Sequence, residues 1–232
     1  MPEPKFIDQL LEQKDAVRVN KTNRIFIDIE TYAGDNKPSL DSIEAPANYT
    51  KPETIAKYKE ENQDKVWRKQ ALHSLKGEII CIAFAVNDSP VQCLFKEKDK
   101  YEIELMMEFE EAVSGVSYPC WIGHNFKRFD NIWLVHRAIK YKLGGLKSML
   151  PQRNSSYKYD TDCIDTMELF AVTSHSSDSW YSLESISEFL GLGKKESSGA
   201  DIHDMYVQGK YDEIISHCKK DIELVRDIYN MV

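Results

Sequence analysis

The chain has 232 residues, of which 42% are hydrophobic and 29% are charged, a balance typical of a folded globular protein rather than a disordered one. A chain of this length can bury a core of its own, and we expect a single domain over residues 1–232. The net charge of −8 argues against broad electrostatic attraction to nucleic acid.

The first strand is predicted over residues 24–31, RIFIDIET, after a helical extension in residues 1–22. Side chains of a strand alternate between its two faces, so Asp28 and Glu30 would project together with Phe26, away from the three isoleucines. Two carboxylates this close repel each other, and keeping both ionised in a partly buried place is costly unless a cation lies between them. The pair indicates either a site for a hard divalent metal or a solvated strand end.

A long insertion is predicted at residues 35–75, where a polar stretch precedes a helical segment over residues 53–75. It interrupts a connection in which a tight hairpin would be expected. Its aromatic and basic residues either line a substrate entrance or pack within the insertion itself: Tyr49, Tyr58, Trp67, Arg68 and Lys69. Two apolar strands follow at residues 78–87 and 90–96, and then an amphipathic helix at residues 101–113.

A second polar group follows the strand predicted over residues 120–123. Asn125 comes just after this strand, and Phe129 and Asp130 open an amphipathic helix whose apolar stripe extends to Ile139. The unpaired amides of a first helical turn stabilise a carboxylate. Asp130 by itself could therefore be an ordinary N-terminal cap.

A third polar pair lies in the helix predicted over residues 214–229. His217 and Asp221 are four residues apart, which places them on the same face of a helix. An ordinary surface hydrogen bond would explain this pair equally well.

The cysteines are far apart in the sequence, and no two of them have the spacing of metal ligands. Most of them lie in apolar runs. We expect reduced core residues rather than a zinc site or a disulfide framework. They are Cys81, Cys93, Cys120, Cys163 and Cys218.

Taken together, these segments resemble the DEDD superfamily of 3′–5′ exonucleases. The resemblance is closest to the proofreading domains of family B DNA polymerases and to related stand-alone phage and bacterial exonucleases. The residues that match its motifs are Asp28, Glu30 and Thr31, then Asn125, Phe129 and Asp130, and finally Asp221. Two connecting segments are also similar, IDTMELF from Ile164 and SLESISEFLGLGKK from Ser182 to Lys195. The resemblance implies an α/β fold of the ribonuclease H-like type, with a mixed sheet flanked by helices and an insertion between the first and second strands.

The resemblance also implies a metal-assisted mechanism with two Mg²⁺ or Mn²⁺ ions. One ion would help to deprotonate water and the other would steady the leaving 3′ oxygen. The implied ligands are Asp28, Glu30, Asp130 and Asp221. The implied contacts with the 3′-terminal nucleotides are Thr31, Asn125 and Phe129. Lys194 or Lys195 could correspond to a lysine that approaches the scissile phosphate in family B proofreading domains, although a solvated loop lysine explains either equally well. Lys127 and Arg128 are candidate phosphate contacts, with a solvent-exposed basic pair as the alternative.

His217 departs from the family pattern. The last aspartate of the family is preceded by tyrosine four residues earlier or by histidine five residues earlier, whereas here a histidine stands four residues before Asp221. A shift of one residue rotates a side chain by about 100° around a helix. The ordinary pKa of histidine, about 6.5, suits proton abstraction at neutral pH better than that of tyrosine, about 10. His217 would therefore act as the catalytic base or orient the attacking water.

We therefore expect a divalent-metal-dependent 3′–5′ exonuclease that acts on the 3′ end of single-stranded nucleic acid, with DNA favoured, and releases nucleoside 5′-monophosphates. The alternatives are a nuclease of RNA, short oligonucleotides or nucleotide messengers, and an inactive ribonuclease H-like binding module. Replication or repair proteins are candidate partners. Because no apolar stretch could span a membrane and the first residues do not resemble a signal peptide, we expect a cytoplasmic protein of a bacterium or a phage-infected cell.

Overall fold

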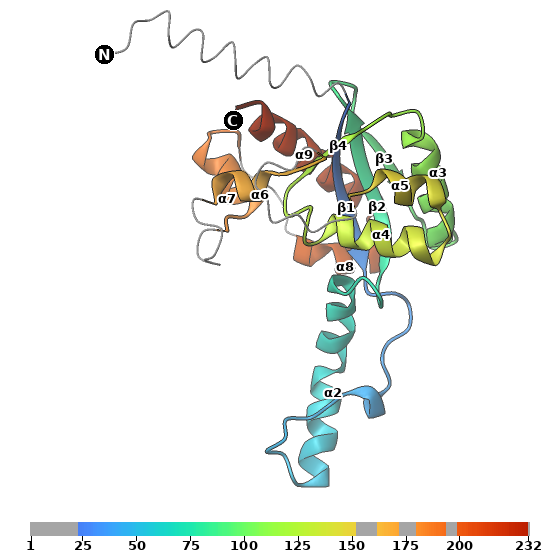
Figure 1. The fold of residues 1–232 in the computed structure, drawn as a ribbon. Helices are drawn as coiled ribbons and strands as arrows, with labels where there is room; N and C mark the ends of the chain where they lie inside the picture. Colours follow the sequence, from blue (N-terminus) through green and yellow to red (C-terminus); the bar gives the residue numbers. More distant parts are fainter. Residues whose placement is uncertain (1–22, 152–161, 172–179, 194–198, 232) are drawn as a thin grey trace, which may run out of the picture.

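The computed structural model describes residues 23–151, 162–171, 180–193 and 199–231 (Figure 1). Within these ranges five strands form one mixed sheet in the order β3-β2-β1-β4-β5. The antiparallel part comprises β1 (Arg24–Tyr32), β2 (Glu78–Val86) and β3 (Gln92–Phe95), and β4 (Cys120–Gly123) and β5 (Cys163–Asp165) continue the sheet in parallel with β1. The expected mixed α/β sheet is confirmed. The predicted extension in residues 1–22, and Lys194 and Lys195, lie outside the described residues.

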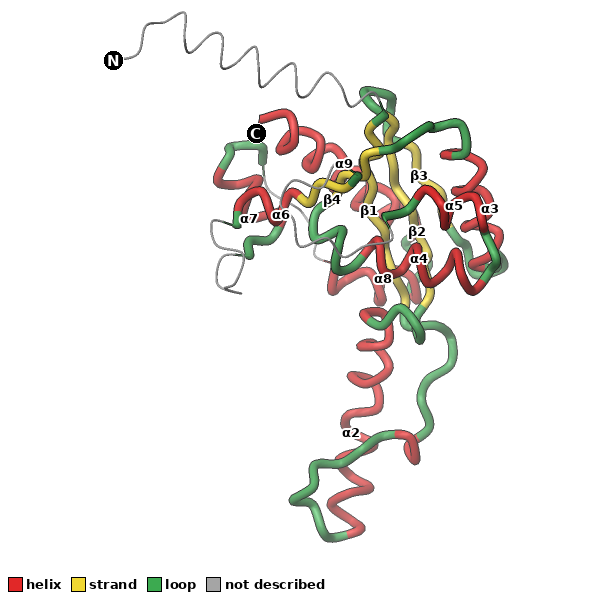
Figure 2. Tube along the Cα trace, in the orientation of Figure 1, coloured by secondary structure: helices red, strands yellow, loops and turns green. Residues whose placement is uncertain are grey.

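Helices cover both faces of the sheet (Figure 2). One core cluster joins the sheet to α3 (Glu102–Val113), α4 (Asp130–Lys140) and α5 (Gly144–Met149). The other joins it to α7 (Leu183–Phe189), α8 (Ile202–Val207) and α9 (Tyr211–Met231), while α6 (Thr166–Phe170) directly follows β5. In the described ranges no helix has both the length and the apolar character needed to cross a membrane.

Strand β1 divides its side chains between the two clusters as predicted. Ile25, Ile27 and Ile29 belong to the cluster with α3 and α4, whereas Phe26 belongs to the cluster with α9. The face that carries Phe26 is therefore the face against which α9 packs. Asp28 and Glu30 follow Phe26 at the period of two that a strand imposes, so they are directed toward α9.

A β-bulge interrupts the pairing of β1 with β2 next to the acidic pair. Glu30 is opposite Cys81, but Thr31 is opposite Ile79, so Ile80 has no opposing residue. Ile80 and Cys81 are consecutive and yet both belong to the cluster with α9. A bulge changes the direction of nearby side chains, and bulges are common beside active sites.

The predicted insertion contains η1 (Leu40–Ser42), α2 (Pro52–Arg68) and η2 (Lys69–Leu72), and α2 extends away from the sheet at the end of β1 (Figure 1). The aromatic residues of the insertion contact each other and the backbone just before it. The ring centres of Tyr49 and Tyr58 are 5.4 Å apart, and the Trp67 indole donates to the Gly34 carbonyl at 2.9 Å. Arg68 pairs with Asp64 and with Asp204 of α8. These contacts favour packing within the insertion over a substrate entrance.

The prediction of an apolar stripe along α4 is wrong in the last turn of the helix. Ile139 is 54% exposed, and the buried positions there are Arg137 and Ala138. Arg137 is buried because its guanidinium pairs with the buried carboxylate of Glu102 and donates to the carbonyls of Ser74 and Gly77. A hydrophobic pattern counts arginine as exposed, but a fully hydrogen-bonded ion pair can occupy a core position.

Candidate active site

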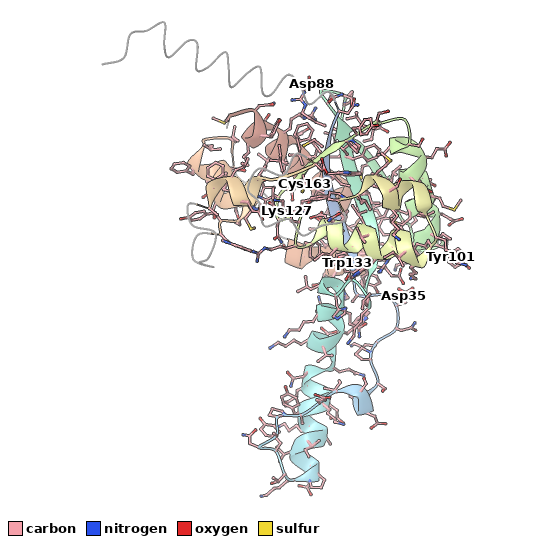
Figure 3. The ribbon with its side chains drawn as sticks, viewed as in Figure 1. Asp35, Asp88, Tyr101, Lys127, Trp133 and Cys163 are labelled. Atoms are coloured by element: carbon pink, nitrogen blue, oxygen red, sulfur yellow. The ribbon has the colours of Figure 1, made fainter. Side chains whose placement is uncertain are left out.

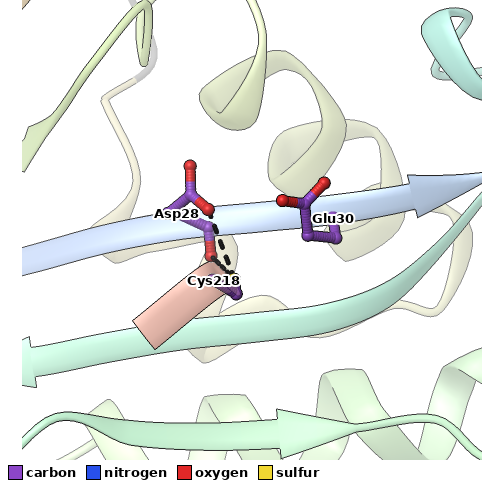
Figure 4. Close-up of side chains that lie close together, drawn as sticks. All are labelled: Asp28, Glu30 and Cys218. Carbon is purple, nitrogen blue, oxygen red and sulfur yellow. Dashed lines mark hydrogen bonds between the residues drawn. The ribbon is translucent and has the colours of Figure 1, made fainter. Parts of the chain in front are cut away.

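Asp28 and Glu30 lie on the same side of β1 and are half-buried (Figure 4). Asp28 lies among other carboxylates. Burial raises its pKa well above the ordinary range, and the nearby charges of Asp221, Glu30 and Asp130 raise it further. These four side chains come from three elements, so the fold concentrates negative charge at one place.

Asp130 reaches this place from the first turn of α4. Its side chain is 3% exposed, and its Oδ1 accepts a hydrogen bond from the backbone N–H of Ile29 at 3.0 Å. That N–H is available because the parallel pairing of β1 with β4 ends at Phe26. Burial raises the pKa of Asp130, although its backbone hydrogen bonds oppose this shift. The N-cap alternative is therefore wrong: the N-cap of α4 is Phe129, and the Asp130 side chain ties the helix to β1 instead.

His217 and Asp221 extend from α9 toward the same carboxylates. The His217 Nε2 atom is 3.2 Å from the Glu30 Oε1 atom and 3.7 Å from the Asp221 Oδ2 atom. Both side chains are buried. The alternative of an ordinary surface hydrogen bond is therefore wrong for this pair.

The structure thus brings together Asp28, Glu30, Asp130, Asp221 and His217. Ligand atoms of Asp28, Glu30 and Cys218 lie within 4.8 Å of one another, and so do those of Glu30, His217 and Asp221. Carboxylate oxygens are the ligands that Mg²⁺ and Mn²⁺ prefer, and imidazole also suits first-row metals. A divalent cation would offset the mutual repulsion that raises the pKa of Asp28, so the residues present fit such an ion.

Cys218 is a site residue that sequence reasoning missed. Its Sγ atom lies 3.3 Å from the Oδ2 atom and 3.5 Å from the backbone oxygen of Asp28 (Figure 4). The thiol therefore donates toward Asp28, and this hydrogen bond lowers the pKa of that carboxyl against the larger effects of burial and charge. A cysteine in the apolar stripe of a helix is predicted to be a core residue. The one signal for a place in the site was that Cys218 directly follows His217 in the sequence.

Asp165 is a second residue that was missed. Its carboxylate accepts from the backbone N–H groups of Asn125 at 2.8 Å, Lys127 at 3.2 Å and Met167 at 3.0 Å. It thereby caps α6 and holds the loop that leads to Asp130, in which Asn125 adopts a positive φ of 57°. Burial raises its pKa to about 6. The signal in the sequence was an aspartate directly before a short helical segment, as in an N-cap.

A close approach between backbones shapes the start of the same loop. A Cβ atom on Gly123 would lie 2.8 Å from the Cβ atom of Phe126 and 3.0 Å from the carbonyl oxygen of Ile27. Both neighbours are held in the core, so a larger residue would displace the loop from β1.

The residues predicted to contact substrate have protein partners of their own. The Thr31 hydroxyl donates to the Ala71 carbonyl of η2 at 2.6 Å, and the half-buried Phe129 packs with its ring 6.1 Å from that of Trp133. The ammonium group of Lys127, which Figure 3 labels, is 2.7 Å from Glu168. The guanidinium carbon of Arg128 is 3.3 Å from the ring centre of Trp180, a cation–π contact.

Comparison with known proteins agrees with this geometry. Residues 69–225 match a family described as a predicted 3′–5′ exonuclease related to the exonuclease domain of PolB. This range includes Asp130, His217 and Asp221, and it begins after Asp28 and Glu30. A search of curated proteins found no match.

Among solved structures, the family B DNA polymerase of the archaeon Pyrobaculum calidifontis is similar, with a TM-score of 0.54 and 14% identity. The match covers 90% of this chain but only 24% of the polymerase chain, so the likeness concerns the fold of one part of that enzyme. The family match spans more than half of the sequence. The chain therefore belongs to the family of predicted 3′–5′ exonucleases related to the exonuclease domain of PolB.

Proposed function

We propose that this protein is a divalent-metal-dependent 3′–5′ exonuclease that hydrolyses single-stranded nucleic acid, with DNA favoured, and releases nucleoside 5′-monophosphates. The observation that carries the proposal is the convergence of Asp28, Glu30, Asp130 and Asp221, in which burial and then the charges of the other three raise the pKa of Asp28. Isolated like charges in a half-buried place are costly. Binding of cations is a functional reason for keeping all four.

In the proposed reaction, the oxygen of a water molecule bonds to the phosphorus of the last phosphodiester. The bond from phosphorus to the 3′ oxygen of the preceding nucleotide breaks, and that oxygen leaves with a proton. We propose that His217, whose ring nitrogen faces Glu30 and Asp221, accepts the proton of the water or orients the attacking water. A neutral imidazole is suited to this role near pH 7.

The four carboxylates would hold one or two Mg²⁺ or Mn²⁺ ions. Such ions lower the pKa of water and stabilise the charge of the leaving oxygen. Cys218 and the Ile29 amide would keep Asp28 and Asp130 in place, because they bind these two carboxyl groups from the protein side. The net charge of −8 suits an enzyme that contacts only the terminal nucleotides, because a negatively charged protein does not attract the rest of a nucleic-acid strand.

The test is a time course on 5′-labelled single-stranded DNA and RNA of one sequence, with Mg²⁺, Mn²⁺ or a chelator. We expect products that shorten from the 3′ end, and no products with chelator. Shortening from the 5′ end would refute the polarity. A labelled dinucleotide assayed in parallel separates an enzyme of short oligonucleotides from one of long strands, because only the former would prefer the dinucleotide.

Variants connect the activity to the site. We expect Asp28→Asn and Asp221→Asn to abolish cleavage and to weaken Mn²⁺ binding measured by calorimetry. Asp227→Asn is the matched control, because Asp227 is an exposed residue of the same helix as Asp221. An inactive binding module would bind no Mn²⁺ at this place, and a control variant that lost activity equally would remove the assignment to these carboxylates.

A further inference from the structure

Two cysteines outside the carboxylate site lie close together. The Sγ atoms of Cys81 on β2 and Cys93 on β3 are 3.1 Å apart. Cys81 is opposite Phe95 and Cys93 is opposite Ala83, so the two cysteines are diagonal neighbours on one face of the sheet. All five cysteines are free thiols.

The two thiols have different surroundings. Cys93 is half-buried and lies on β3, which is at the edge of the sheet. Its pKa is lowered by the hydrogen bond with Cys81, and the charge of Lys219 acts in the same direction. Cys81 is buried, and its pKa is raised mainly by hydrogen bonds with Cys218 and Cys93. A half-buried thiol with a lowered pKa, in contact with a second thiol, is the arrangement found in redox-reactive cysteine pairs.

We propose that Cys81 and Cys93 form an oxidation site that reacts with hydrogen peroxide to give an intramolecular disulfide. The Cys93 thiolate attacks one peroxide oxygen, the O–O bond breaks, and the departing hydroxide takes up a proton to become water. Cys93 is then a sulfenic acid. The sulfur of Cys81 attacks the Cys93 sulfur, the S–O bond breaks, and the departing hydroxide leaves as water with the Cys81 proton. Two thiols are oxidised by two electrons, and one peroxide is reduced to two waters.

The geometry requires a limited movement. A disulfide bond is about 2.05 Å long, so the sulfur atoms must approach by about 1 Å. Diagonal residues are farther apart than directly opposite ones because they are offset along the strands, so β3 must slide along β2 as the bond forms. This is feasible because β3 has four residues and, within the described part of the chain, pairs with β2 alone.

The pair is also connected to the carboxylate site. Cys218 is near enough to Cys81 to raise the pKa of the Cys81 thiol, and the Cys218 thiol in turn reaches Asp28. Forming the disulfide would remove the thiol proton of Cys81. The oxidation site is thus separated from Asp28 by one side chain.

The experiment uses the full chain, reduced and then freed of reductant. After treatment with hydrogen peroxide, remaining thiols are blocked with N-ethylmaleimide, and the protein is digested without reduction for mass spectrometry. We expect a Cys81–Cys93 crosslinked peptide pair that disappears with dithiothreitol. Of the five thiols, two should become unreactive, and Cys163 should remain a free thiol because it is buried and burial raises its pKa.

Two variants sharpen the result. Cys93→Ser should retain its four thiols after peroxide, because the reactive thiol is missing. Cys163→Ala is the matched control and should still form the crosslink. Five free thiols in the treated protein, or a crosslink between other cysteines, would overturn the proposal. This outcome is independent of nuclease activity, so it leaves the proposed function unaffected.

Discussion

Asp130 offers a substitution pair that separates its structural contact from its charge. Its Oδ1 atom accepts from the Ile29 N–H, and the carboxylate is buried among acidic neighbours that raise its pKa. In Asp130→Asn the amide oxygen can still accept this hydrogen bond, and the buried charge is removed. In Asp130→Ala the charge is removed as well, but the Ile29 N–H is left without its acceptor.

A buried N–H without a partner costs about 1–3 kcal/mol. In a protein of this size, each kcal/mol changes Tm by about 2–4 °C. We therefore expect Asp130→Ala to melt about 2–12 °C below Asp130→Asn in the absence of divalent cations. Both variants should lose cleavage activity to a similar extent, because both remove a proposed ligand.

The assay is thermal unfolding followed by circular dichroism in chelator, together with the cleavage time course. Equal melting temperatures for the two variants would refute the structural role of the Ile29 hydrogen bond. Near-parental cleavage by Asp130→Asn would refute the ligand role of the carboxylate.

Three further predictions concern a proton, a pH dependence and a buried ion pair. His217→Ala should lower single-turnover cleavage by about 10²–10⁴-fold, the usual worth of a general base, and near-parental activity would exclude that role. For Asp165, the folded-state pKa of about 6 lies above the unfolded value, so its contribution to stability is present below pH 4 and is lost as the pH rises through 6. Urea unfolding at several pH values should show the free energy of unfolding falling by about 3 kcal/mol from this group. Asp165→Asn should flatten the dependence of this free energy on pH in the same range. An unchanged dependence in the variant would contradict the raised pKa of Asp165. Arg137→Met removes the buried cation that pairs with Glu102, leaves this carboxylate only the exposed Lys140 ammonium at 3.4 Å, and should cost about 3–5 kcal/mol. Lys100→Met, which breaks an exposed pair, should cost about 1 kcal/mol or less by the same measurement, and equal losses would be evidence against the buried pair.

Several features could be predicted from short stretches of sequence. The alternation in residues 24–31 correctly separated the isoleucines from Phe26, because the side-chain period of a strand depends only on the local backbone. The spacing of His217 and Asp221 correctly placed them on one face of a helix. The roles of these residues in catalysis remain predictions for the experiments above.

Other features depended on contacts between distant segments. Ile139 was predicted to face the core but is exposed, and Arg137 is buried nearby instead. Arg137 can be buried because Glu102, 35 residues earlier, supplies a buried counter-charge. Asp165 holds the Asn125 loop across 40 residues.

The amino-acid sequence by itself determined the periods of two and about 3.6 residues, and with them the faces of β1 and α9 and the order of the acidic motifs. Only the tertiary structure decided which residues meet the carboxylates. Cys218 reaches Asp28 across 190 residues of sequence, and Cys81 meets Cys93 because β2 and β3 pair in one particular register. Such contacts depend on how whole strands and helices pack, which no local pattern of side chains specifies.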